Sequence, residues 1–183
     1  MLKLADIVVN ILKSNVTQTL ILLITPFTYI VVRYYNRREA ARTVIMQIDD
    51  IDKKTKVLVE DALKAAKNND MDIFWQSDKI IEVNSWEINK RLLTCGLDLK
   101  QISYMDKYYS DVLFVSEQQE KIKYVISEAS KSIAYKGKDE MTKADMIKIP
   151  IRFLDTLEMK YKVILSDRAM IPYEKLKKIA KIK

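Results

Sequence analysis

The sequence predicts an all-α protein, in which a single N-terminal transmembrane helix continues into a cytoplasmic helical bundle whose first helix is coiled-coil-like. Two observations predict helices throughout. The 183 residues include only two glycines, and neither an Asn-Gly or Asp-Gly turn nor a long alternating run indicates a sheet. The third observation is an uncharged, largely apolar run over residues 14–32, which predicts the membrane helix.

Residues 1–13 are predicted to form an amphipathic N-terminal segment. Their apolar residues recur at helical spacing and the polar ones fall on other faces; the apolar set is Leu4, Ile7, Val8, Ile11 and Leu12. Two interpretations follow. The segment lies as a short helix on the outer membrane surface, or it lengthens the following helix by a few turns.

Residues 14–35 are the predicted transmembrane helix. The nineteen uncharged residues 14–32 span about 28 Å as a helix, close to the ~30 Å hydrocarbon core of a bilayer. Threonine hydroxyls return their hydrogen bond to the carbonyl four residues back, and a membrane helix tolerates a proline such as Pro26. Tyr34 and Tyr35 are expected at the membrane interface, where aromatic residues gather.

The charges that flank this run argue against the two other interpretations. A cleaved signal peptide carries its positive charge before the apolar run and small residues after it, and a core helix has a polar face. Here Arg33, Arg37, Arg38 and Arg42 follow the run. This pattern predicts a cell-membrane protein with its N-terminus outside and its C-terminal domain in the cytoplasm, and a single cysteine agrees with a reducing compartment.

The net charge of +7 is concentrated at the two ends of the chain. Residues 1–42 carry +4, residues 43–170 carry −1 and residues 171–183 carry +4. An anionic lipid surface attracts such clusters, whereas nucleic acid, which needs a spread basic face, is an unlikely partner. The residues predicted to bind the membrane surface are Arg33, Arg37, Arg38, Arg42, Lys175, Lys177, Lys178 and Lys181.

Residues 171–183 are predicted to form a basic amphipathic tail, with Pro172 at the first helical position. One face is apolar and the other is lysine-rich; the apolar positions are Tyr173, Leu176, Ile179 and Ala180. Three interpretations remain open: the tail binds lipid headgroups, docks in the groove of a partner protein, or frays as a solvated terminus.

Residues 36–170 form the predicted bundle, and its first helix has a heptad pattern. Seven of eight positions that alternate in steps of three and four are apolar; the eight are Ala41, Val44, Ile48, Ile51, Thr55, Leu58, Ala62 and Ala65. Ile45, Val59 and Leu63 widen this stripe, which favours an intramolecular bundle over a parallel homodimer. Polar residues 67–72 are expected to end the helix.

A short helix is predicted from Ser85 to Cys95, with Asn84 and Glu87 as a capping box and Gly96 as a left-handed C-terminal residue. Trp75 and Trp86 are candidate anchors for a partner protein, with packing in the core as the alternative. Cys95 is expected to be a small buried hydrophobe.

A second long helix is predicted from Asp98, as N-cap, to Lys136, with Gly137 as its stop. Its apolar stripe comprises Ile102, Met105, Tyr109, Val112, Val115, Ile122, Ile126, Ala129 and Ile133. A third helix would start at Asp139 or Thr142 and be interrupted or restarted at Pro150. Residues 151–165 would supply further core.

The composition argues against catalysis. The chain has no histidine and one cysteine, which removes the commonest general base and the usual zinc ligands. Two glycines cannot build a nucleotide-binding glycine-rich loop, and the acidic pairs lack calcium-loop spacing. We therefore expect a non-enzymatic protein without a metal or a cofactor.

The expected function is that of a scaffold or adaptor, which presents a helical interaction module to a protein partner or to further copies of itself at the cytoplasmic membrane face. One alternative is a membrane-perturbing, holin-like or defence-type effector that oligomerises through threonines of its span. Another is a membrane tether for nucleic acid. The Ile-, Lys- and Asn-rich composition suggests a bacterial or phage source.

Overall fold

The computed structural model describes residues 15–68, 76–136, 156 and 159–182. Its elements are α2 (Asn15–Asn68), α4 (Ser85–Leu93), the short 3-10 helix η1 (Thr94–Gly96), α5 (Leu99–Lys136) and α7 (Tyr173–Ala180), and residues 159–170 are also helical. These described parts contain no strand, which confirms the all-α prediction. The predicted segment 1–13, Trp75, Gly137 and the start of the third helix lie outside them.

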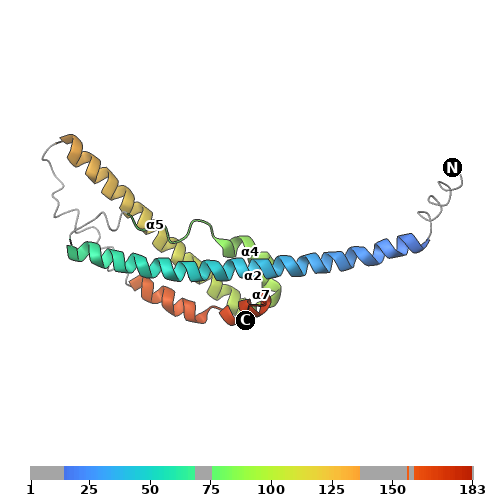
Figure 1. The fold of residues 1–183 in the computed structure, drawn as a ribbon. Coiled ribbons are helices and arrows are strands. Elements are labelled where there is room, and N and C mark those ends of the chain that lie inside the picture. Colours follow the sequence, from blue (N-terminus) through green and yellow to red (C-terminus); the bar gives the residue numbers. More distant parts are fainter. Residues whose placement is uncertain (1–14, 69–75, 137–155, 157–158, 183) are drawn as a thin grey trace, which may run out of the picture.

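The molecule is a helical bundle built along one end of α2 (Figure 1). The other helices gather around residues 37–68 of α2, which we call the stem, and α4 and α7 contact it directly. Residues 18–32 of α2, which we call the arm, project beyond the bundle, and residues 33–38, where the arm meets the stem, are its root.

The heptad positions of the stem form the centre of the core. All eight predicted positions, from Ala41 to Ala65, are at most 1% exposed. The chain's own helices cover this seam, as in a helical bundle within one chain. Ile45 is also buried, whereas Leu63 is exposed, and the widened stripe therefore narrows toward the end of α2 at Asn68.

The short helix α4 begins and packs as predicted. The Asn84 side chain accepts a hydrogen bond from the Glu87 N–H at 3.0 Å, and Gln47 of the stem accepts the Ser85 N–H at 2.9 Å. Trp86 is 1% exposed, and its Nε1 donates to Asp106 Oδ1 at 2.7 Å. Burial alone would raise the pKa of Asp106, but the hydrogen bonds from Lys90 and Trp86 hold it below its usual range.

The end of this helix differs from the prediction. The chain continues from Leu93 into η1, and Gly96 does not have the left-handed φ that we expected. Its lack of a side chain serves packing instead, because a Cβ there would lie 1.7 Å from Nη2 of Arg37. Cys95 is exposed, so the prediction that it is buried was wrong: it lies on the outer side of the 3-10 turn.

The long helix α5 starts with a reciprocal cap. The Gln101 N–H donates to Asp98 Oδ1 at 2.8 Å and the Asp98 N–H donates to Gln101 Oε1 at 3.1 Å. Its predicted apolar stripe faces the core: Met105, Tyr109, Val112, Val115 and Ile126 are buried, and Ile102 and Ile122 pack beside them. Farther along, α5 diverges from α2 (Figure 1).

The predicted transmembrane helix over residues 14–35 is not supported. Within the described parts of the chain, no helix is both long and apolar enough to cross a bilayer. Gln18, Thr25, Pro26 and Thr28 dilute the hydrophobicity of this stretch. Residues 15–35 form no separate element either, since they belong to one helix that continues without a break to Asn68.

Candidate membrane interface

The arm is apolar on all sides. From residue 18 to residue 32 it carries no charge, and of its described side chains only that of Val31 is not classed as exposed. Leu20, Ile21 and Leu22 are consecutive and all at least 51% exposed, and successive helical residues point about 100° apart. The apolar surface therefore surrounds the helix instead of forming one stripe.

The polar groups of the arm are partly satisfied within its own helix. Thr25 Oγ1 donates to the Ile21 carbonyl at 2.8 Å and Thr28 Oγ1 donates to the Ile24 carbonyl at 2.9 Å. These hydrogen bonds to the carbonyl four residues earlier are the ones expected from the sequence, and they satisfy the hydroxyl donors within the helix. Pro26 lies inside the helix without ending it.

Arginines at the root of the arm contact neutral groups of the bundle. Arg33 Nη2 donates to Cys95 Sγ at 3.4 Å, and Arg38 Nε donates to the Ala180 carbonyl at 3.0 Å at the end of α7. Arg37 lies against Gly96. Among the described residues no carboxylate pairs with these three arginines.

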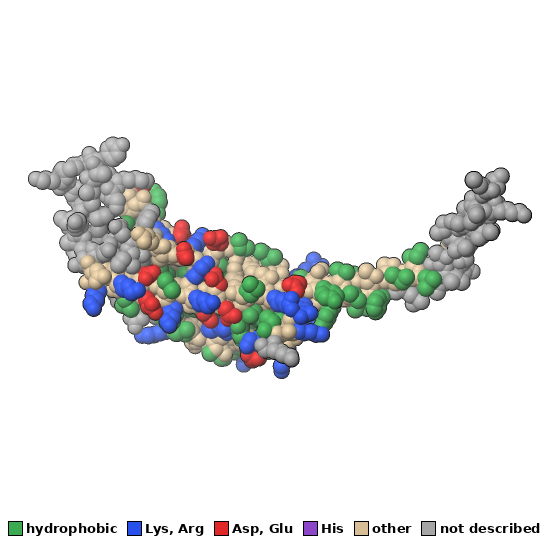
Figure 2. Space-filling view, in the orientation of Figure 1, with side chains coloured by type: hydrophobic (Ala, Val, Ile, Leu, Met, Phe, Trp, Pro, Cys, Tyr) green, Lys and Arg blue, Asp and Glu red, His purple; other side chains and the backbone are tan. Residues whose placement is uncertain are grey.

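The tail joins the arginines at this root. Lys181 lies 5.3 Å from the centre of the Tyr34 ring, and Tyr34 itself meets Tyr35 edge-to-face at 6.0 Å. The sequence predicted two separate membrane-facing segments, whereas the structure places them at one end of the bundle. We call Arg33, Arg37, Arg38, Arg91 and Lys181 the basic collar; Figure 2 shows Lys and Arg side chains clustered where the apolar arm begins.

The other predicted surface residues lie outside the collar. Arg42 forms an ion pair with Glu39 at 2.7 Å, and Lys177 pairs with Glu174 at 3.3 Å. Lys175 donates to Gln101 Oε1 at 2.9 Å. Lys178 is exposed on α7.

The apolar face of the tail is already occupied. Leu176 and Ala180 are fully buried, and Tyr173 and Ile179 pack against the core. The helix begins at Tyr173, one residue after Pro172, which is its N-cap and not its first residue. The tail is thus a docked helix of the bundle that leaves its lysines toward solvent, and the fraying interpretation does not apply to its described residues.

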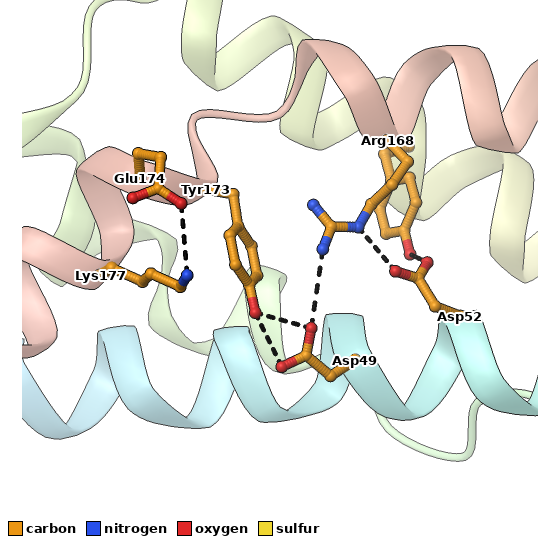
Figure 3. A network of polar contacts seen from close by, with 7 residues as sticks. Asp49, Asp52, Arg168, Tyr173, Glu174 and Lys177 are labelled. Carbon is orange, nitrogen blue, oxygen red and sulfur yellow. Dashed lines mark hydrogen bonds and ion pairs between the residues drawn. The ribbon is translucent and has the colours of Figure 1, made fainter. Parts of the chain in front are cut away.

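A polar network fixes the docked tail to the stem (Figure 3). The Tyr173 hydroxyl bonds Asp49 Oδ1 and Oδ2 at 2.7 and 2.8 Å, and Arg168 Nε donates to Asp52 Oδ2 at 2.7 Å. The Arg168 guanidinium lies 4.2 Å from the Tyr173 ring centre. Burial and the Asp49 carboxylate raise the pKa of Tyr173 to about 12, and burial followed by the Asp52 charge raises the pKa of Tyr108.

A shallow pocket of about 320 Å³ lies between the root of the arm and the end of α4. Its lining combines apolar side chains with two guanidinium groups; the residues are Tyr29, Val32, Arg33, Asn36, Arg91 and Leu92. The sequence analysis missed Arg91, which is separated from Arg33 by the whole stem, residues 69–84 and most of α4. No spacing rule within one helix would connect them.

The two candidate anchors for a protein partner have different outcomes. Trp86 is buried among core residues, the alternative that we weighed, and its ring offers no free surface. Trp75 lies outside the described residues. The described part of the chain holds no group of three or more side chains suited to a metal ion.

Comparison with known proteins finds no matching protein family, no matching curated protein and no matching solved structure.

Proposed function

We propose that this protein is a membrane-attached helical scaffold. The arm inserts into a lipid bilayer, the basic collar lies among the headgroups, and the bundle is presented to a protein partner at the cytoplasmic face. The observation that carries the proposal is the arm itself, an uncharged, largely apolar helix exposed on all sides, next to a stem whose heptad face is buried.

Lipid suits the arm better than a partner helix does. A helix that packs on another helix presents one apolar stripe, as the stem does, whereas a helix that is apolar all round belongs in an apolar surrounding. A single partner helix would leave Leu20, Ile21 or Leu22 in water. Hydrocarbon covers every face at once, and the hydrogen bonds of the threonines within the helix reduce the polar cost of insertion.

The charges at the root support the same placement. Anionic headgroups attract Lys and Arg near the surface at about 1 kcal/mol each, and the collar collects such residues from α2, α4 and the C-cap of α7. We place the bundle on the cytoplasmic side because positive residues beside an inserted segment favour that side. With the arm inserted, Tyr34 and Tyr35 would lie at the membrane interface, where aromatic residues gather.

The test is vesicle flotation with the full chain and two matched variants. Ile24→Lys places a charge near the middle of the arm, where Ile24 is 58% exposed, and Val57→Lys places the same charge on the solvent side of the stem, where Val57 is 51% exposed. Replacing Ile by Lys within an inserted helix costs about 3 kcal/mol, roughly a hundredfold in partitioning. We expect that loss for Ile24→Lys and binding close to wild type for Val57→Lys.

Circular dichroism should show the same helicity in both variants, because neither position is buried. Equal vesicle binding by wild type and Ile24→Lys would overturn the proposal, since the arm would then not be the segment in lipid.

A further inference from the structure

The pocket between the arm and α4 has the lining that a phospholipid headgroup needs. On the α2 side, Tyr29, Val32, Arg33 and Asn36 follow each other at helical spacing and share one face. On the other side, Arg91 lies in the last turn of α4, next to Leu92. The pocket is therefore polar and cationic at one part and apolar at another.

Both guanidinium groups are available to an anion. Arg33 donates from Nη2 to the Cys95 thiol, a weak acceptor that leaves its charge uncompensated. Within the described residues, no carboxylate forms an ion pair with Arg33 or Arg91. A guanidinium presents several N–H donors in a fixed plane, which suits bidentate binding of phosphate oxygens.

The neighbouring packing holds the Arg33 side of the pocket in place. Cys95 belongs to η1, and at the following Gly96 the Arg37 guanidinium occupies the space that a Cβ would take. The root of α2 and the end of α4 are thus closely apposed. The two arginines reach the pocket from different helices without a conformational change.

From these observations we propose that the pocket binds the phosphate of an anionic phospholipid, with Arg33 and Arg91 on the phosphate oxygens and Tyr29, Val32 and Leu92 against the apolar part of the lipid. This inference rests on the proposed membrane attachment, because an inserted arm puts its root, and hence the pocket, at headgroup depth. It adds a specific lipid site to the general attraction between the collar and an anionic surface.

The experiment compares two charge-matched double variants of the full chain. Arg33→Gln/Arg91→Gln removes both pocket guanidiniums, and Arg42→Gln/Lys178→Gln removes two positive charges outside the pocket. Each protein is titrated with vesicles of phosphatidylcholine alone and of phosphatidylcholine with phosphatidylglycerol, at one ionic strength. A further titration with inorganic phosphate, without vesicles, separates a lipid site from a site for free phosphate.

We expect the pocket variant to lose about tenfold more affinity for the phosphatidylglycerol vesicles than the control variant, as for the loss of charged hydrogen bonds. Binding to phosphatidylcholine alone should stay the same in all three proteins, which shows that the arm still inserts. Equal losses in both variants would overturn the specific site and leave only general electrostatics.

Two other outcomes are also decisive. Saturable binding of inorganic phosphate that Arg33→Gln/Arg91→Gln abolishes, without a difference between the vesicle types, would replace the lipid by free phosphate as ligand. Absence of wild-type binding to either vesicle would refute the membrane attachment itself, and the lipid site with it.

Discussion

The arm and the stem are two parts of one helix with opposite surroundings. Both are rich in Ile, Leu and Val, yet Ile48 of the stem is fully buried and Ile24 of the arm is 58% exposed. The difference lies in the spacing of charge. In the stem, charged residues such as Asp49, Asp50 and Lys53 fill the positions between the heptad residues, whereas the arm has none. The periodic spacing of charged residues, more than hydrophobicity, indicates which segment of the helix is buried by the rest of the chain.

The largest expected effect is on the free energy of unfolding, when an isoleucine is replaced by alanine in the stem and, for comparison, in the arm. Ile48→Ala leaves a cavity in the core and should lower the free energy of unfolding by about 2–5 kcal/mol. Ile24→Ala removes no contact within the bundle and should stay within about 0.5 kcal/mol of wild type. Denaturant unfolding followed by the fluorescence of buried Trp86 measures both. A comparable loss for Ile24→Ala would mean that the arm packs on the bundle.

The next effect concerns the tail that covers the stem. Tyr173→Phe keeps the ring against Arg168 but removes the hydroxyl proton that the two Asp49 carboxylate oxygens share, which should cost about 1.5–3 kcal/mol. The vesicle binding of the arm should not change. Limited proteolysis should cut residues 171–183 faster in the variant, and unchanged cutting would show that the network does not hold the tail.

The same residue gives a pH prediction. The pKa of Tyr173 is raised from about 10 in the unfolded chain to about 12 in the fold, so the folded state favours the protonated phenol. The stability that the fold gains from this protonated phenol is fully present below pH 10 and is lost as the pH rises to 12. Wild type should therefore lose more stability than Tyr173→Phe across this window. Tyr109, whose burial raises its pKa to about 12, titrates in both proteins and cancels in the difference.

The smallest effect is expected at the boundary between arm and stem. Arg42→Gln breaks an exposed ion pair with Glu39 and should change the unfolding free energy by less than about 0.5 kcal/mol. Arg38→Gln instead removes the charged donor that caps the last turn of α7 at Ala180, and should cost about 1–2 kcal/mol. Thermal unfolding of the pair compares them, and equal shifts would argue against the Arg38 contact.

Local sequence patterns predicted much of the fold. The 3-4 spacing identified the buried face of α2, and the short-range caps at Asn84 and Asp98 located the starts of α4 and α5, because each depends on residues within a few positions. The position of the arm in the chain was also visible as an uncharged run.

Contacts between distant residues could not be predicted in this way. The role of Gly96 depends on Arg37, fifty-nine positions earlier, and glycine after a helix usually indicates a left-handed turn instead. Cys95 was expected in the core because free cysteines are commonly buried, but the 3-10 turn rotates it outward. The docking of the tail likewise depends on Asp49. From the sequence alone this residue is expected to be a solvated charge of the stem, and only the structure shows that it accepts the Tyr173 hydroxyl.

The continuity of α2 has a mechanical consequence. Its 54 residues form a rod of about 80 Å, and residues 15–36 and the bundle axis lie on this one rod without a hinge loop between them. Helices in bilayers commonly tilt by about 20°, and a tilt of about 20° displaces the far end of such a rod by roughly 27 Å. A membrane-held arm would thus act as a lever, and a change in bilayer thickness would swing the bundle toward or away from the lipid surface.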